Sequence, residues 1–582
     1  MANRALSFDA PEERLCDSLA DDSPATRPRL LRRCRRFGGV LLLALVAGLG
    51  LATGCGGDDA ATEPPPLAEG VATAPEPPEG VALDSDQFGE ASIIYFKQCA
   101  GCHGTLRAGA TGPSLEPAAM QERGSPVIEA VVQNGLPGGM PPWGNAGFLD
   151  EEEVSLMARY LQMNIAAPPQ LDLDEIRESW KLEVPVDDRP SEPQTTRDWT
   201  NYTGVILRDA GKVAILDADT REQVAVVNTG FAVHILRSSA SGRYFYAIGR
   251  DGKLTLIDLW YEVPEVVAEV KGCIDARSVE SSKFEGFEDK FVIEGCYWPN
   301  QFIIFDGLTL EPKKLTKYPT ETFDTGEELA EVRVAAIVAS DDAPQWVVAL
   351  KESGFIALVD YSKDDFPIVK MIEGQRFLHD GGFDHTGRYF AIAANERNQI
   401  VVVDLKEGKR AARITTGIKP HPGRGANWKD PEFGWVMATT HIGEGKMTVY
   451  GADPVNNPEH AWKVVREVEL PSSGTLFLKT HPKSPWVWTD ATLSTDPEAS
   501  RTVCAYSKAK AKIEKCFSIS DHGRATHFEY NKQGTQIWVS NWDKKGEVVV
   551  YDDKTLKEVG RVTGLETPTG KFNVNNTAND IY

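Results

Sequence analysis

The sequence lacks the basic excess of a nucleic-acid-binding protein. Its 62 Lys and Arg residues stand against 85 Asp and Glu residues, and the formal net charge at pH 7 is −23. Binding to nucleic acid generally requires a positively charged face, so the composition argues against a nucleic-acid partner. A strong negative charge is instead consistent with a soluble, self-repelling protein outside the cytoplasm. With 582 residues the chain exceeds one ordinary domain, and we expect at least two.

The N-terminal region contains no convincing membrane span. A cluster of arginines from Arg27 to Arg36 is followed by the apolar run Val40–Ala52, "VLLLALVAGLGLA". This run is too short and too rich in glycine to be a membrane span, but it suits the apolar region of a signal peptide. The run ends in "LATGCGG", which predicts a bacterial lipoprotein signal peptide over 1–54 and a lipid on Cys55; an ordinary signal peptide is the alternative. We therefore expect a periplasmic protein whose only membrane attachment is this lipid anchor.

The next segment lacks aromatic residues. Residues 56–82 are rich in Pro, Ala, Glu and Gly. Such a composition cannot bury enough apolar surface to offset the entropy lost on ordering. We interpret residues 55–85 as a flexible tether.

A haem attachment motif follows. The stretch "YFKQCAGCHG" contains Cys99, Cys102 and His103 in the pattern C-x-x-C-H. Two thioethers fix the porphyrin edge at this spacing, and the following histidine becomes the proximal iron ligand. A chance match or a redox C-x-x-C pair is the alternative. The motif predicts one covalent haem c.

A second iron ligand is expected several dozen residues later. Met140 lies in "GLPGGMPPWGN", where Gly and Pro suit an irregular loop against the haem; a packing methionine is the alternative. The stretch "DEEEVSLMARYLQMN" then has an acidic start and the apolar spacing of an amphipathic helix. We therefore predict a small all-α cytochrome c domain over 86–168, with His/Met ligation and an electron-transfer role.

From residue 169 onward short β-branched runs recur at intervals typical of four-stranded propeller blades. Each run ends near an anchor residue, and these anchors are Asp217, Asp258, Asp306, Asp360, Asp404, Gly451, Tyr506 and Asp552. Separate β-sandwiches are the alternative, but they do not predict one period over the whole region. We predict an all-β eight-bladed propeller over 169–582, closed by a blade that joins the two ends of the region.

The motifs of both domains resemble the cytochrome cd1 nitrite reductase family. The similarity covers residues from about 90 to 582 and includes "YFKQCAGCHGTLRAGATG", "FAVHILRSSASGRY", "RVAAIVAS", "FLHDGG", "PHPGRGAN", "KTHP" and "PTGKFNV". The resemblance implies haem c in the small domain and a non-covalent haem d1 in the propeller channel.

The resemblance also implies roles for individual residues. His234 is expected to be the proximal ligand of the haem d1 iron, and His379 a distal histidine near the substrate. Haem d1 carries several carboxylates, and buried anions need paired charges. The candidate partners are Tyr297 and the arginines Arg208, Arg237, Arg250, Arg277 and Arg333.

Three departures from the family pattern bear on function. We expect the second distal histidine directly after "RVAAIVAS", where this chain has Asp341, a candidate catalytic carboxylate. A carboxylate has an ordinary pKa near 4 and donates protons at neutral pH only if burial raises that value. His527 stands where we expect glutamine and is a second candidate replacement. The tether contains no tyrosine to cover haem d1.

These features leave three functions open. The first is reduction of nitrite to nitric oxide at haem d1, with electrons delivered through haem c. The second is dehydrogenation of dihydro-haem d1 during haem d1 biosynthesis, which Asp341 favours. The third is non-catalytic binding of haem d1. A small cytochrome c or a cupredoxin is the expected electron-transfer partner, and the family implies a possible homodimer.

Four further cysteines are expected to form disulfides, because an exported protein meets an oxidising compartment. Cys504 and Cys516 flank a predicted hairpin, and Cys273 and Cys296 lie on neighbouring predicted strands. Both pairs are predicted to be bridged; free buried thiols are the alternative.

Overall fold

The computed structural model describes residues 67, 74–109, 112–136, 140, 142–145 and 148–581. The predicted signal peptide over 1–54 and the predicted lipid attachment site Cys55 lie outside the described residues. Among the residues that are described, no helix is long and apolar enough to cross a membrane.

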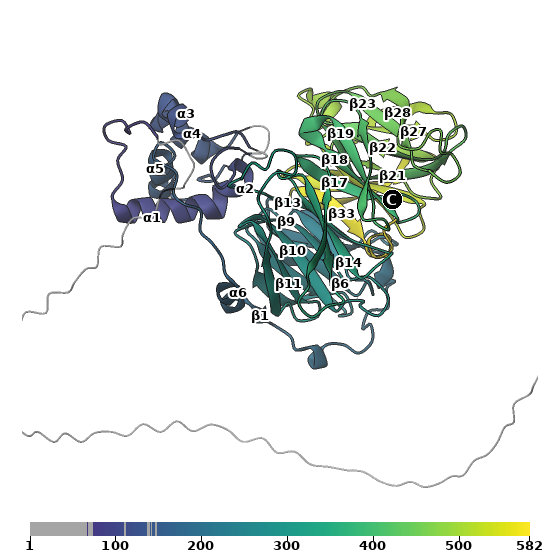
Figure 1. Ribbon diagram of the computed structural model, residues 1–582, viewed down its shortest axis with the longest axis horizontal. Coiled ribbons are helices and arrows are strands. Elements are labelled where there is room, and N and C mark those ends of the chain that lie inside the picture. Colours follow the sequence, from purple (N-terminus) through teal and green to yellow (C-terminus); the bar gives the residue numbers. More distant parts are fainter. Residues whose placement is uncertain are drawn as a thin grey trace, which may run out of the picture. The chain divides into compact units, whose positions relative to one another are not determined.

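The first part of the described chain is helical (Figure 1). Its helices are α1 (Ser85–Ile94), the π-helical turn η1 (Tyr95–Cys99), α2 (Ala100–His103), α3 (Pro117–Arg123), α4 (Ser125–Asn134) and α5 (Glu151–Tyr160). Capping boxes start two of them: Asp84 pairs with Gln87 at α1, and Asp150 pairs with Glu153 at α5. The apolar face of α5 is buried in the core of this domain, as its periodicity predicts.

The end of the predicted tether is packed against this helical domain. The Ala74 backbone N–H donates to Asn164 Oδ1 at 2.7 Å, and Gln121 donates to the Pro75 carbonyl at 3.0 Å. Val81 is buried. The described residues from 74 onward are therefore held by the domain, and in this part of the tether the expectation of a flexible segment is wrong.

Eight four-stranded antiparallel sheets follow, and one of them gains β1 (Lys181–Leu182) as a fifth strand. Their first strands are β5 (Ile235–Ser238), β9 (Asp275–Ser281), β13 (Val334–Ala339), β17 (Leu378–Phe383), β21 (Pro420–Asp430), β25 (Leu478–Lys479), β29 (Ala525–Tyr530) and β33 (Pro568–Asn573). The second strands are β6 (Tyr244–Ile248), β10 (Phe291–Trp298), β14 (Gln345–Leu350), β18 (Tyr389–Ala394), β22 (Gly434–His441), β26 (Trp486–Thr489), β30 (Gln536–Asn541) and β2 (Tyr202–Leu207).

The third strands contain the recurring runs. They are β7 (Lys253–Asp258), β11 (Gln301–Asp306), β15 (Phe355–Asp360), β19 (Gln399–Asp404), β23 (Lys446–Gly451), β27 (Thr502–Ser507), β31 (Gly546–Asp552) and β3 (Lys212–Asp217). Each predicted anchor lies at or next to the end of one of them. The outer strands are β8 (Glu265–Lys271), β12 (Pro312–Lys317), β16 (Ile368–Glu373), β20 (Lys409–Thr415), β24 (Val464–Glu469), β28 (Lys512–Ser518), β32 (Lys557–Leu565) and β4 (Gln223–Asn228).

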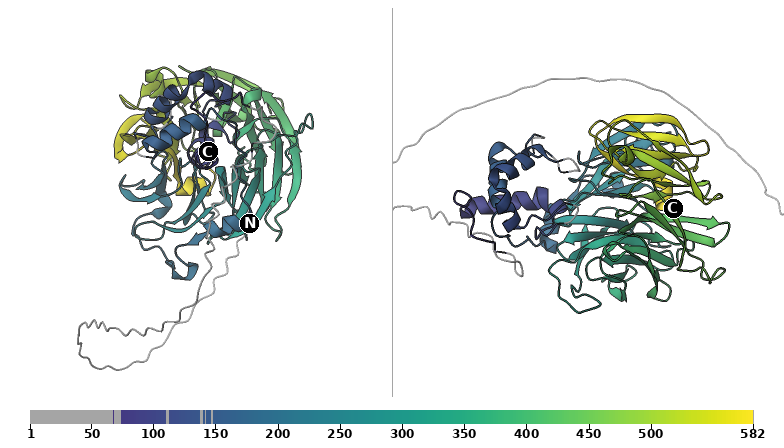
Figure 2. Two further views of the ribbon diagram at one scale, coloured as in Figure 1. Left: turned by 90° about the vertical axis from the view of Figure 1, so that its left-hand side faces the viewer. Right: turned by 90° about the horizontal axis from the view of Figure 1, so that it is seen from above.

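The sheets form the predicted eight-bladed propeller, and the left view of Figure 2 shows the ring. The last strand, β33, pairs antiparallel with β2, and Asn573 lies opposite Thr203. The two ends of the propeller sequence therefore share one blade, as predicted. Three short helices complement the strands: α6 (Leu173–Ser179), α7 (Pro497–Ser500) and α8 (Val574–Ala578).

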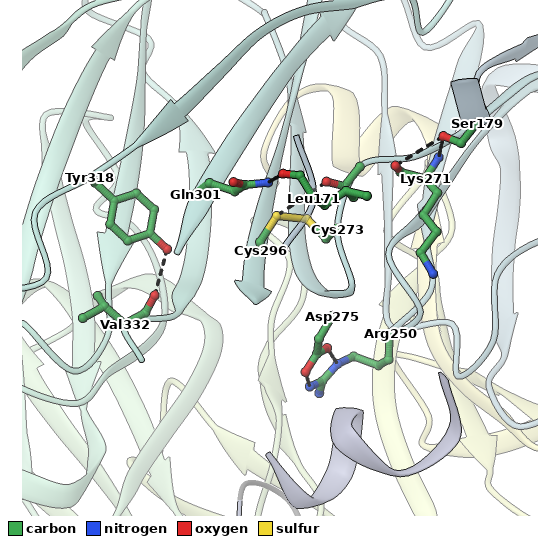
Figure 3. The surroundings of a disulfide bond; sticks show 11 residues. Leu171, Ser179, Arg250, Lys271, Cys273, Asp275, Cys296, Gln301, Tyr318 and Val332 are labelled. Carbon is green, nitrogen blue, oxygen red and sulfur yellow. Dashed lines mark hydrogen bonds and ion pairs between the residues drawn. A yellow bond between two sulfur atoms is a disulfide. The ribbon is translucent and has the colours of Figure 1, made fainter. Parts of the chain in front are cut away.

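Both predicted disulfides are formed. Cys504 and Cys516 face each other directly in the register of β27 and β28. Cys273, just after β8, is bonded to Cys296 of β10 (Figure 3). The free-thiol alternative is therefore wrong for these four residues.

Candidate functional site

A cavity of about 800 Å³ is lined by residues of the helical domain and of the propeller. It contains the predicted haem c residues Cys99, Cys102, His103 and Met140. It also contains His234, His379, Tyr297 and all five predicted arginines. Of the predicted site residues, Asp341 alone does not line it. The structure thus brings together residues that are spread over about 280 positions of the sequence (Cys99 to His379).

The haem c end of the cavity is built around His103. The π-helical turn ends at Cys99, and α2 then carries Cys102 and His103. The His103 ring is buried, and its Nδ1 lies 2.8 Å from the Pro113 carbonyl oxygen, so Nδ1–H donates and Nε2 is left to bind a metal. A Cβ at Gly112 would lie 2.9 Å from Cε1 of His103, so a side chain at position 112 would displace the ring.

The environment of the cysteines disfavours a redox C-x-x-C pair. Burial raises the pKa of the Cys99 thiol to about 12, whereas redox-active cysteines have lowered pKa values. Met140 is partly buried against the domain core and lines the same cavity as His103. Two thiols, an imidazole and a thioether in an apolar cradle fit a covalent haem c.

His234 precedes β5 and lines the propeller end of the cavity. Its backbone N–H donates to the Ile248 carbonyl at 2.9 Å, which fixes the residue in the blade. Burial lowers the pKa of His234 well below the usual value, and the cations of Arg277 and Arg250 lower it further. The ring is therefore neutral at pH 7, which is the form that ligates iron.

Each of the five predicted arginines has a carboxylate partner within the protein. The pairs are Arg208–Asp209 at 2.6 Å, Arg237–Glu280 at 3.6 Å, Arg250–Asp275 at 2.7 Å, Arg277–Asp380 at 3.4 Å and Arg333–Glu331 at 2.9 Å. Figure 3 shows the Arg250–Asp275 pair. The arginines line the cavity as predicted, but carboxylates of the protein already partly compensate their charges.

Lys351 and Tyr297 offer further groups for an anionic cofactor. Lys351 lines the cavity, and among the described residues no carboxylate forms an ion pair with it. Tyr297 Oη accepts a hydrogen bond from Arg277 Nε at 2.9 Å, so its own proton is available to a ligand. Burial raises the pKa of Tyr297, but Arg277 and Lys351 outweigh it, and the net shift is downward. Sequence reasoning missed Lys351, because a lysine at the end of a strand resembles a surface residue.

Two imidazoles meet in the cavity. His379 Nε2 lies 3.1 Å from His421 Nε2, and Asp380 Oδ2 lies 3.9 Å and 3.6 Å from these two nitrogens. His421 Nδ1 lies 2.7 Å from the Leu476 carbonyl oxygen and must donate to it. The Nδ1 atom of His379 is buried without a hydrogen-bond partner in the described part of the chain. A buried polar atom of this kind signals a missing ligand or water.

One neighbouring charge, the Asp380 carboxylate, favours a proton on this pair, whereas burial and the Arg277 cation oppose it. Burial lowers the pKa of both His379 and His421, so both rings are neutral at pH 7. Burial raises the pKa of Asp380, but His379 and Arg277 outweigh it, and the net shift is strongly downward. Two neutral imidazoles beside an ionised carboxylate can accept a proton and release it to a ligand.

Asp341 lies away from the cavity. It follows β13, is exposed, and lies close to Gly387 in the turn between β17 and β18, whereas His379 lies at the opposite end of β17. The interpretation of Asp341 as the replacement of a distal histidine is therefore wrong, and His421 supplies the second imidazole. The signal was present in "PHPGRGAN", but a histidine between two prolines does not reveal which ring it will face.

His527 also lines the cavity, but no hydrogen bond in the described part of the chain joins it to His379 or His421. Its Nδ1 accepts the Lys571 backbone N–H at 3.2 Å, and its ring packs against Phe477 and Phe572. Burial lowers its pKa well below the usual value, and Lys571 lowers it further. Phe477 also packs edge-on against His421 and thus touches both rings.

Comparisons with known proteins agree with this geometry. Residues 197–577 match the family model "Cytochrome D1 heme domain", and residues 87–161 match "Cytochrome C oxidase, cbb3-type, subunit III". A haem d1 propeller preceded by a haem c domain is the class that these matches define. The chain belongs to the cytochrome cd1 nitrite reductase family, and its cofactors are haem c and haem d1.

Individual relatives support the same assignment. The chain is 44% identical to the nitrite reductase of Stutzerimonas stutzeri over 550 residues, which cover 89% of this chain and 96% of the relative. It is 30% identical to the dihydro-heme d1 dehydrogenase of Pseudomonas aeruginosa over 493 residues, which cover 84% and 95%. A solved structure of the dihydro-heme d1 dehydrogenase NirN superposes with a TM-score of 0.67 at 28% identity, covering 84% of this chain and 99% of that one.

Proposed function

We propose that this chain reduces nitrite to nitric oxide. The observation that carries the proposal is the contact between His379 and His421, because it places two proton-holding rings 3.1 Å apart in the cavity. The reaction consumes one electron and two protons and releases water: NO2⁻ + e⁻ + 2 H⁺ gives NO and H2O. An imidazole pair beside an ionised carboxylate is suited to supply both protons.

The cavity residues divide the remaining tasks. His234 would ligate the haem d1 iron, while His379 and His421 would serve the substrate. When bound, haem d1 supplies the electron and an iron that binds nitrite. Arg277 donates to Tyr297 and Asp380 and lies 3.2 Å from His379 Nε2, so it holds the distal groups in place and adds a positive charge that attracts an anion. The Cys99–His103 segment and Met140 would hold haem c, which would supply electron transfer to the site.

The pair can hold its protons in two arrangements. Since His421 Nδ1–H is directed to Leu476, a neutral His421 offers a bare Nε2, and His379 donates its Nε2–H to it. If His421 is protonated instead, it donates to His379, whose Nε2 then also accepts from Arg277 at 3.2 Å. The two arrangements differ by one proton, and the Asp380 carboxylate stabilises the charged one.

The alternative of a dihydro-haem d1 dehydrogenase loses its main support. Its support in the sequence is the expected replacement of a distal imidazole by Asp341, and Asp341 lies outside the cavity. Non-catalytic binding of haem d1 does not require a pair of imidazoles in contact with each other, such as His379 and His421. The discriminating experiment gives the haem d1-loaded protein nitrite and the unloaded protein dihydro-haem d1; the proposal requires turnover of nitrite and fails if only the macrocycle is converted.

We further propose a periplasmic location and lipid attachment at Cys55. These follow from the signal pattern in the sequence, and a Cys55→Ser variant should appear in the soluble fraction with an unchanged haem c spectrum. A small cytochrome c or a cupredoxin is the proposed electron donor. A homodimer is the proposed assembly, and light scattering of the purified protein measures it.

A further inference from the structure

Asp490 lies behind the cavity wall and touches both segments that carry the distal aromatic groups. It follows β26 directly and is almost fully buried, with 3% of its surface exposed. Its Oδ1 accepts the backbone N–H groups of Leu476 at 2.8 Å and Phe477 at 3.1 Å. Its Oδ2 accepts the backbone N–H of His527 at 3.3 Å. One carboxylate therefore joins the blade of β25 to the blade of β29.

The Leu476–Phe477 segment, bound by Asp490 Oδ1, determines which ring nitrogen of His421 carries the proton. The Leu476 carbonyl accepts the Nδ1–H of His421 at 2.7 Å, and the Phe477 ring lies edge-on to the His421 ring, with the centroids 6.0 Å apart. A rotation of the Leu476 peptide would remove the acceptor that keeps the proton on Nδ1. The bare Nε2 that faces His379 depends on that acceptor, because a neutral imidazole carries only one proton.

The backbone at His527, bound by Asp490 Oδ2, has a conformation that is unfavourable for a non-glycine residue. His527 has φ +55°, in the left-handed region, and the pairing of β29 with β30 shifts register between Thr526 and Phe528. A non-glycine residue needs local support to stay in that region. The hydrogen bond from its N–H to Asp490 provides this support, and the His527 ring in turn packs on Phe477.

From these contacts we infer that Asp490 is a positioning residue of the distal site: it fixes the Leu476–Phe477 peptide and the His527 bulge, and through them the tautomer and orientation of His421. It touches neither the cavity nor the substrate. The kinetic consequence rests on the proposed function, whereas the structural consequence does not.

The test compares Asp490→Asn with Asp430→Asn. Asp430 serves as the control, because it is equally buried, accepts the backbone N–H groups of Glu432 and Phe433, and does not line the cavity; it differs in that its Oδ2 also pairs with Arg466 at 2.6 Å. Hydrogen exchange is measured on the protein with haem c attached and haem d1 absent. Asp490→Asn keeps one acceptor oxygen, so exchange should accelerate about tenfold, the factor that one lost hydrogen bond represents, in at least one of the segments 476–479 and 526–528, the one that faces the new amide nitrogen. Asp430→Asn should leave both segments unchanged.

Kinetics of the haem d1-loaded variants supply the second readout. Asp490→Asn should lower kcat for nitrite about tenfold, with KM and haem d1 content within about twofold of the parent, because a misplaced proton donor affects chemistry more than binding. Unchanged exchange in both segments, or an equal loss of kcat in Asp430→Asn, overturns the inference. If neither the parent protein nor any variant reduces nitrite, the proposed function fails. The hydrogen-exchange measurement still decides the positioning role of Asp490 in that case. If Asp490→Asn does not fold, Asp490→Glu, which keeps the charge but displaces it, is judged by the same criteria.

Discussion

His379 and His421 are 42 residues apart in the sequence, and their Nε2 atoms lie 3.1 Å apart in the cavity. His379 is the second residue of β17 and His421 the second residue of β21, the first strands of adjacent blades, so the blade repeat itself brings the rings together. Blade spacing therefore sets the separation of the two proton donors, and only side chains at the same end of both strands can meet in this way.

Removal of one ring should disable proton delivery. His421→Gln keeps a polar side chain but cannot hold and release a proton near neutral pH, so nitrite turnover should fall about 100-fold, a usual size for one general acid. The matched control is Asp341→Asn, which should change turnover by less than about twofold because Asp341 is exposed and remote. Equal losses in both variants would contradict the placement of the site.

Lys351 should contribute to haem d1 retention. It is a cavity cation without an ion pair among the described residues, whereas each of the five arginines has a carboxylate partner. Lys351→Gln should therefore weaken haem d1 binding about tenfold, the usual effect of one partly buried charge contact. The binding curve is measured by optical titration of protein without haem d1. Lys510→Gln, at an exposed pair with Glu514, is the control and should leave the curve unchanged.

The buried histidines should make stability depend on pH. Burial lowers the pKa of His379, His421 and His527, so protonation favours the unfolded chain. Their contribution to stability is complete above the unfolded pKa near 6.5 and is lost as pH falls below it, by up to about 1.4 kcal/mol per pH unit for each ring. Without haem d1, the free energy of unfolding should fall between pH 7 and pH 5, and His527→Gln should flatten that slope.

His522 provides the control for this slope. It is only partly buried, and a hydrogen bond to Asp521 raises its pKa, so the small stability it adds is present at low pH and lost as pH rises. His522→Gln should not flatten the fall seen between pH 7 and pH 5. Denaturant unfolding at several pH values measures both variants.

The Cys504–Cys516 disulfide should support the fold without serving the site. Its loop spans 12 residues between β27 and β28, so replacing both cysteines by alanine should lower the free energy of unfolding by about 2–3 kcal/mol. The rate of nitrite turnover per loaded protein should not change. A large loss of turnover at unchanged haem d1 content would show that this blade controls the distal site.

The sequence predicted the repeat, the closure of the ring and the haem c motif, because each depends on local spacing. It also predicted most cavity residues through family motifs. It did not predict which imidazole faces His379, since that depends on the rotation of neighbouring blades. Nor did it reveal the carboxylate partners of Arg237, Arg250 and Arg277 or the burial of Asp490, because pairings between blades leave no mark in a single run of residues.

The most direct test is a single-turnover reaction of protein loaded with haem d1 and reduced at both haems. On mixing with ¹⁵N-nitrite under anaerobic conditions, the account predicts release of ¹⁵N-labelled nitric oxide. For each molecule of nitric oxide formed, the reduced haems should lose one electron. It also predicts that formation slows strongly when His379 and His421 are both replaced by glutamine. Failure of the fully loaded parent protein to release nitric oxide, or an unchanged rate in the double variant, would contradict it.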